Sequence, residues 1–146
     1  METGQEDKWG LRHPHMQRFL ELWERAWANP GGGELADFWT DDAVVHVTEG
    51  NAVSGADIAG YVVKFLELAP DLASRPLAAG ESGRTLFVHF RIGGTFAGKR
   101  FEWDGVDRLD FRPGEERAYR AETFYDPQVV RDAIAHVEAA HAAERS

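Results

Sequence analysis

The stretch RFEWDGVDRLDF, residues 100–111, alternates between an apolar and a polar face, and it constrains the fold more than any other part of the chain. A period of two residues is typical of a β-strand with one face against the core. The apolar face consists of Phe101, Trp103, Gly105, Asp107, Leu109 and Phe111. Asp107 is the exception, because a buried carboxylate is costly unless it is paired, hydrogen-bonded or neutralised. The pattern therefore predicts either a local partner for Asp107 or a function for it.

The remaining segments predict helices first and then mainly strands. Helical spacing of apolar residues or helix-start signals predict helices over 15–28, 34–39 and 55–69 and from Asp126 onward. Alternating or β-rich runs predict strands over 41–50, 72–79, 84–96, 100–111 and 117–125. Ser54 is the expected N-cap of the third helix, Pro76 predicts an edge strand, and Gly93 with Gly94 predicts a bulge or bend.

This order of elements is typical of an α+β domain. We expect three or four helices across one face of a strongly curved antiparallel or mixed sheet, which makes a cone-shaped α+β barrel wrapped around the helices. A pocket between sheet and helices is then the default site. The chain has 146 residues and is 43% hydrophobic, which suits one domain over 1–146. We expect residues 1–13 to be flexible and 144–146 to fray.

Composition and motifs exclude several classes of function. The net charge of −9 argues against nucleic acid or an anionic membrane as a partner. The chain has no cysteine, no HExxH-type ligand set and no glycine-rich nucleotide motif, so we expect neither metal nor cofactor. No run approaches the roughly 20 apolar residues that span a bilayer, and the first residues lack a signal-peptide pattern. We expect a cytoplasmic protein.

Four stretches resemble the SnoaL-like polyketide cyclases, in the superfamily shaped like nuclear transport factor 2. They are FWTDDAVVHV at 38–47, SGADIAGYV at 54–62, GGTFAGKRFEWDGVDRLDF at 93–111 and RAETFYDP at 120–127. The resemblance covers residues 15–130. It implies polar catalytic groups inside an apolar cone, without metal or organic cofactor, and an inner-strand acid or histidine that acts in ring closure.

Two other branches of that superfamily place their key carboxylates elsewhere. Ketosteroid isomerase and limonene epoxide hydrolase carry one on the first or last long strand. Those positions correspond to Val47 and Thr123 here, and neither side chain exchanges a proton as a carboxylate does. The resemblance to the cyclases instead points to the strand of Asp107.

Asp107 is the leading catalytic candidate. In an apolar pocket its pKa rises through desolvation, which suits removal of an acidic proton near neutral pH, and Gly105 would leave room beside it. The alternative is a structural carboxylate that a backbone turn, Arg91 or Arg108 satisfies.

Two histidines are the other catalytic candidates. His46 can donate a proton or a hydrogen bond to a substrate oxygen, or it can lie on the outer face of the sheet. His89 shares a strand face with Arg91, and this pair can hold an enolate or carboxylate, or form a salt-bridged subunit interface.

The residues expected to bind substrate would form a pocket wall that fits a bulky apolar ligand, although the aromatic residues among them suit core packing as well. The set is Trp39, Tyr61, Arg91, Trp103, Leu109, Thr123 and Tyr125. The outer sheet face carries Arg120, Glu122 and Phe124 beside the apolar strand 85–93. Such a surface predicts a homodimer.

The sequence therefore predicts a cofactor-independent cyclase or isomerase for a hydrophobic polyketide-type intermediate, of the kind found in antibiotic biosynthesis. The pocket would bring the reacting carbons together while Asp107, with His46 or His89, moves protons. A pericyclic closure would need mainly shape and one hydrogen bond. The alternative is a non-catalytic dimeric binding module or carrier for a small lipophilic ligand.

Overall fold

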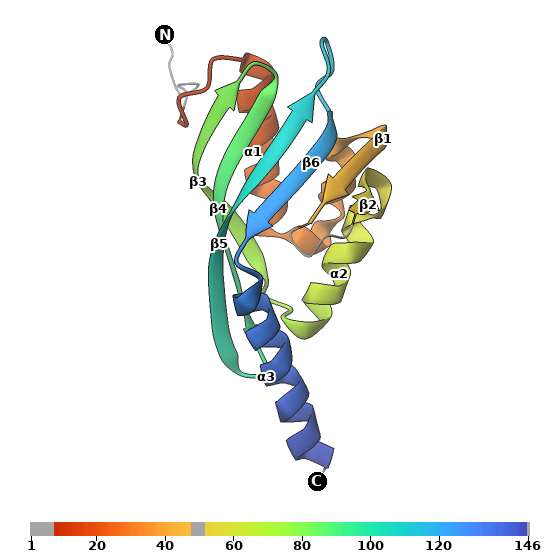
Figure 1. Cartoon of the computed structure of the whole chain (residues 1–146), viewed down its shortest axis with the longest axis vertical. Coiled ribbons are helices and arrows are strands. Elements are labelled where there is room, and N and C mark those ends of the chain that lie inside the picture. The colour runs from red at the N-terminus through yellow and green to blue at the C-terminus, as the bar shows by residue number, and fades with distance from the viewer. Residues whose placement is uncertain (1–7, 48–51, 146) are drawn as a thin grey trace.

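The computed structural model describes residues 8–47 and 52–145 (Figure 1). Its α-helices are α1 (Pro14–Ala28), α2 (Ile58–Leu68) and α3 (Pro127–Arg145). Its strands are β1 (Trp39–His46), β2 (Ala52–Ser54), β3 (Ala73–Ser82), β4 (Thr85–Phe96), β5 (Lys99–Phe111) and β6 (Ala118–Tyr125). Short 3₁₀ turns precede β1 and α2. Within the two described ranges, no helix combines the length and apolarity needed to cross a bilayer.

The six strands form one curved sheet in the order β2-β1-β6-β5-β4-β3. Neighbouring strands are antiparallel except β1 and β6, which run parallel, so the sheet is mixed. The order is linear and the sheet stays open instead of closing into a barrel. The predicted α+β class with a curved mixed sheet is confirmed. Pro76 lies on the edge strand β3, as expected, where the register with β4 shifts.

The helices pack against the concave face of the sheet. In Figure 1, α1 lies behind the sheet, α2 lies below β1 and β2, and α3 continues from β6 past the far end of the β4–β5 hairpin. The first core cluster joins Phe19, Leu20 and Trp23 of α1 to Val88 and Leu109 of the sheet. A second, smaller cluster joins α3 to the hairpin through Ala133, Val137 and Phe96. These two clusters anchor α1 and α3 to the sheet.

The alternation predicted for 100–111 is present in β5. Gly105, Asp107 and Leu109 are buried, whereas Asp104, Val106 and Arg108 are exposed. The Gly105 position does not leave room beside the carboxylate. A Cβ there would lie 2.4 Å from Cζ of Phe90 and 2.7 Å from the carbonyl oxygen of Phe124. The missing side chain instead makes space for the Phe90 ring.

Some local expectations differ from the structure. Of the bulge or bend predicted at Gly93 and Gly94, a bulge does not form, because β4 pairs with β5 in unbroken register. A Cβ on Gly94 would lie 2.9 Å from that of Ala69, so a close approach of two segments accounts for this glycine. Ser54 does not cap α2: its hydroxyl donates to Asp57 at 2.9 Å, ahead of a 3₁₀ turn.

Residues near both ends of the described part of the chain contact the domain or belong to a helix. Leu11 is buried, and the backbone N–H of Arg12 donates to the carboxylate of Glu81. Residues 8–13 therefore pack on the domain, whereas 1–7 lie outside the described residues. At the other end α3 continues as helix through Arg145.

We predict that Gly105→Ala destabilises the fold by about 1–3 kcal/mol, because the new methyl group must displace the Phe90 ring or separate β5 from β6. Urea unfolding measures the difference. Gly80→Ala is the control, since a Cβ at Gly80 on β3 meets nothing within 4 Å. Equal stability of the Gly105 variant and the parent would show that the Phe90 contact is not a constraint.

Candidate functional site

A pocket of about 720 Å³, counting the space at its open mouth, lies between the concave face of the sheet and the helices. Every second residue of three strands faces it: Phe90 and Ile92 of β4, Trp103 and Asp107 of β5, and Thr123 and Tyr125 of β6. The period of two along each strand explains this spacing. Side chains of α1, α2 and α3 complete a mainly apolar wall, to which α2 contributes the most residues.

Strand register places the Thr123 hydroxyl beside the Asp107 carboxyl group in the wall of this pocket. Asp107 on β5 pairs directly with Val88 on β4 and Thr123 on β6. Asp107 is only 8% exposed, and the Thr123 hydroxyl donates to its Oδ1 at 2.7 Å. Its second oxygen, Oδ2, has no hydrogen-bond partner in the described part of the chain. One oxygen is thus held in place and the other is available to a ligand.

The environment of Asp107 disfavours its charged form. Burial raises the pKa of Asp107 to about 7, and the hydrogen bond from Thr123 offsets only part of that rise. The two arginines considered as structural partners pair elsewhere: Arg91 with Asp104 at 2.7 Å, and Arg108 with Asp110 at 3.3 Å. The local partner of Asp107 is a neutral hydroxyl, so the carboxyl group titrates near physiological pH.

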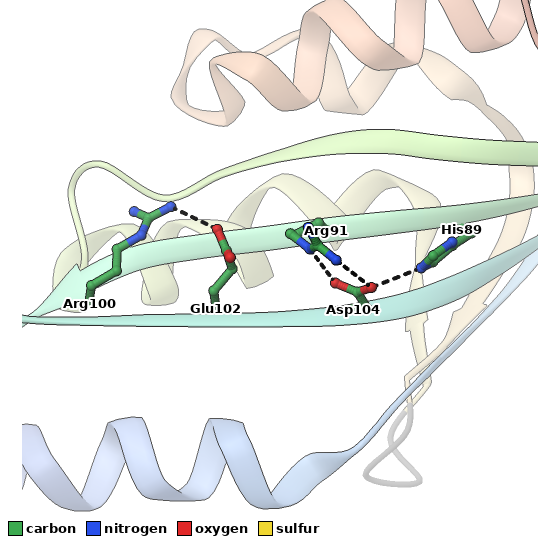
Figure 2. A network of polar contacts seen from close by, with 5 residues as sticks. All are labelled: His89, Arg91, Arg100, Glu102 and Asp104. Atoms are coloured by element: carbon green, nitrogen blue, oxygen red, sulfur yellow. Dashed lines mark hydrogen bonds and ion pairs between the residues drawn. The ribbon is translucent and has the colours of Figure 1, made fainter.

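His89 and Arg91 lie on the opposite face of the sheet. Figure 2 shows both side chains on Asp104, with His89 Nε2 3.0 Å from Oδ2 and Arg91 Nε 2.7 Å from Oδ1. The hydrogen bond from Arg91 is the main reason why the pKa of Asp104 falls to about 2. Neither His89 nor Arg91 lines the pocket, so the relay expected between Asp107 and His89 does not form.

His46 is also outside the pocket. Its neighbours Val45 and Val47 line the pocket, which places the His46 side chain on the other face of β1, opposite Glu122 of β6. Two apolar members of the expected set are core residues instead. Trp39 is buried and donates its indole N–H to the Leu35 carbonyl at 2.8 Å, and Leu109 is fully buried.

The pocket therefore brings together half of the predicted site residues, namely Tyr61, Trp103, Asp107, Thr123 and Tyr125. Sequence reasoning missed Trp27, Ser74 and Phe90 in the wall. Alternation along the strand places Phe90 on the face opposite His89 and Arg91. It did not show which face lines the pocket, because both faces of that strand contain apolar residues. The sequence indicated Trp27 only as part of the apolar stripe of the first helix, and not as a pocket residue. In the described residues, no cluster of acidic and histidine side chains is arranged to hold a metal ion.

Comparison with known proteins gives the fold a family. The sequence matches the family model of the SnoaL-like domain over residues 16–120. No curated protein matches it. Among solved structures, a candidate SnoaL-like polyketide cyclase from Jannaschia sp. CCS1 is 17% identical with a TM-score of 0.67, and the alignment covers 85% of this chain and 96% of that one.

Two further structures share the fold at similarly low identity. AclR from Streptomyces galilaeus, a candidate hydroxylase, is 17% identical with a TM-score of 0.68 over 82% of this chain and 95% of its own. A candidate polyketide cyclase from Bacillus cereus ATCC 10987 is 11% identical with a TM-score of 0.71 over 84% and 81%. Because the family match spans most of the sequence, and the curved sheet, helices and pocket agree with it, the protein belongs to the SnoaL-like domain family.

Proposed function

We propose that the protein is a cofactor-independent cyclase or isomerase for a hydrophobic, polyketide-type intermediate, with Asp107 as its acid and base. The observation that carries the proposal is a buried carboxyl group of pKa about 7, in the wall of an apolar pocket, whose hydrogen bond comes from Thr123. Structural neighbours described as candidate polyketide cyclases support this substrate class.

The chemistry needs one group that can both take and return a proton. The Asp107 anion removes a proton from a carbon next to a carbonyl group. The C–H electron pair forms a C=C bond and the carbonyl π pair moves onto oxygen, which gives an enolate. In a cyclase the enolate carbon attacks a second carbonyl carbon of the same molecule, and protonated Asp107 returns the proton to the new alkoxide. In an isomerase the proton returns to another carbon. A base with a pKa near the working pH is efficient in both directions.

The pocket contributes orientation and exclusion of water. Its wall is apolar apart from a few side chains, so a flexible substrate is held in the folded shape in which its reacting carbons meet. The histidines His46 and His89 have no part in this mechanism, since both lie outside the pocket. A carrier would use the same apolar wall but would have no use for a carboxyl group that titrates near pH 7.

We predict that the protein catalyses exchange of the acidic C1 protons of 2-tetralone, a small bicyclic ketone, with deuterium from D₂O. Proton NMR follows the loss of the signal. Because the anion is the base, kcat/KM should rise with pH and level off above about 7. Asp107→Asn should lower the rate about a hundredfold or more.

Asp104→Asn is the matched control, since it removes a carboxylate from the outer face of the sheet and should leave exchange unchanged. A folded Asp107→Asn variant that exchanges at the parental rate would remove Asp107 from the mechanism. Binding of 2-tetralone without any exchange in the parent would favour the carrier.

We predict that burial of Asp107 makes stability depend on pH. The folded-state pKa of about 7 exceeds the usual value, so between about pH 4 and pH 7 the folded protein binds more protons than the unfolded chain. The contribution of this group to the free energy of unfolding therefore falls as pH rises through that window. Asp107→Asn should be more stable than the parent at pH 8, by up to about 4 kcal/mol, and the gap should close near pH 4. Urea unfolding at both pH values measures it, and a gap independent of pH would contradict the raised pKa.

We also propose that two copies pair through the outer face of the sheet. Phe124 is 49% exposed there and lies opposite Val106, and Phe87 of β4 is exposed on the same face. We predict a dimer in light scattering at about 50 μM and a monomer for Phe124→Asp, because a charge at the centre of an apolar contact is costly. Leu22→Asp, which changes an equally exposed residue on α1, should remain dimeric. A parent that is monomeric at this concentration would contradict the proposal.

A further inference from the structure

The strand β3 contributes Ser74, a hydroxyl-bearing residue, to the pocket wall. Ser74 pairs with Ile92 of β4, which also lines the pocket, and residues directly opposite each other on antiparallel strands point to the same face. The next pair along is Arg75 with Arg91, and Figure 2 shows Arg91 bonded to Asp104 on the outer face. Because side chains alternate along a strand, the Ser74 side chain points inward, and it is only 8% exposed.

The Ser74 hydroxyl is unpaired and open to a molecule the size of water. Within the described part of the chain, no group forms a hydrogen bond with its Oγ. Two buried side-chain atoms of that part combine a missing partner with closure to solvent, namely Nε2 of His15 and Nε1 of Trp27. Ser74 Oγ is not one of them, so a water molecule reaches it. A ligand atom in the pocket can therefore take the place of that water.

Strand pairing shows how far Ser74 lies from Asp107. Ser74 pairs with Ile92, and Asp107 pairs with Val88, four residues away from Ile92 on β4. The strands β3 and β5 lie on the two sides of β4. Four residues along a strand and two strand spacings across it put the two Cα atoms roughly 16 Å apart on a flat sheet. The sheet curves and both side chains reach inward, so a ligand that contacts both spans roughly 10 Å.

The geometry points to Ser74 as the residue that binds a second oxygen of the ligand, at the end remote from Asp107. The ligand is then an elongated, mainly apolar ketone, roughly three fused rings in length, with a hydroxyl or carbonyl group at its far end. A serine hydroxyl both donates and accepts, so it suits either group. A site that hydrogen-bonds a ligand oxygen discriminates against the analogue that lacks it, because the polar group of the site is left unpaired.

The identity of the reacting end rests on the proposed function, whereas the oxygen site at Ser74 does not. With the far oxygen on Ser74, the ligand lies in one direction along the pocket and presents one of its acidic carbons to Asp107. The Ser74 contact is remote from the bonds that change, so it is made equally in the ground state and the transition state. Such a contact lowers KM and leaves kcat unchanged.

Two tricyclic ketones that differ in one far oxygen test the site. The first is 3,4-dihydro-2(1H)-anthracenone, and the second is its 6-hydroxy derivative, with the hydroxyl at the end remote from the C1 protons. Calorimetry or NMR titration measures their affinities. Ser74→Ala should weaken binding of the hydroxy ketone about five- to tenfold, as loss of one hydrogen bond does, and change binding of the other less than about twofold. Ser82→Ala, at the exposed end of β3, is the matched control and should change neither affinity.

Exchange kinetics separate this binding role from the chemistry. Deuterium exchange at C1 of the hydroxy ketone should show a raised KM and an unchanged kcat in Ser74→Ala. The same variant should exchange the unsubstituted ketone with parental constants. Circular dichroism of each variant checks that it is folded.

Three results would overturn the assignment. Equal weakening of both ketones in Ser74→Ala, or no weakening of either, would show that the hydroxyl binds no ligand oxygen. A hydroxyl-specific loss in Trp103→Phe but not in Ser74→Ala would place the far oxygen on β5, since Trp103 belongs to the same row of paired residues as Ser74. Failure of the parent to bind either ketone would contradict the inferred ligand length.

Failure of the proposed function gives a different pattern. A hydroxyl-specific loss of affinity in Ser74→Ala, with no exchange of the C1 protons in the parent, keeps the oxygen site and removes the acid–base role of Asp107. Exchange that depends on Asp107, with both affinities unchanged in Ser74→Ala, keeps the acid–base role and removes the oxygen site.

Discussion

The site depends on a carboxyl group buried in an apolar face, with a neutral hydroxyl as its hydrogen-bond partner. A carboxylate that pairs with arginine becomes more acidic, as Asp104 does on the outer face. Asp107 lies on the same strand, but its side chain is on the buried face, and burial raises its pKa to about 7. Alternation along a single strand thus separates a permanently charged carboxylate from one that can exchange a proton. Burial of this carboxyl group also makes its contribution to the free energy of unfolding fall as pH rises from about 4 to about 7.

The curvature of the sheet gives that carboxyl group a pocket to act in. Core clusters anchor α1 and α3 to the sheet, and the pocket lies between the sheet and the helices. Close approaches at Gly94 and Gly105 let backbone and rings come together where a side chain would hold them apart. Thr123 then fixes one oxygen of Asp107. Position and polarity at the site therefore follow from the packing around it.

Periodicity made β5 and its inward Asp107 predictable, because one face of that strand is clearly more apolar than the other. The same reasoning could not assign the faces of β1 and β4. There Val44 and Phe87 are exposed on the outer face, so apolar residues occur on both sides, and the sequence pattern left both faces open for His46 and His89. Trp39 and Leu109 lie on the inner face of the sheet, as expected, but they pack in the core and do not line the pocket. A sequence pattern does not distinguish these two environments. Trp27 needed tertiary structure, because only coordinates show that its N–H lacks an acceptor.

Direct titration of the Asp107 side chain tests the central claim most closely. In uniformly ¹³C-labelled protein the Cγ resonance reports the protonation of each carboxyl group, and Asp107→Asn identifies the signal that belongs to this residue. We expect its midpoint near pH 7, well above those of the exposed carboxyl groups. A midpoint near pH 4 would mean that the pocket does not hold Asp107 in its neutral form, and it would contradict both the proposed acid–base role and its physical cause.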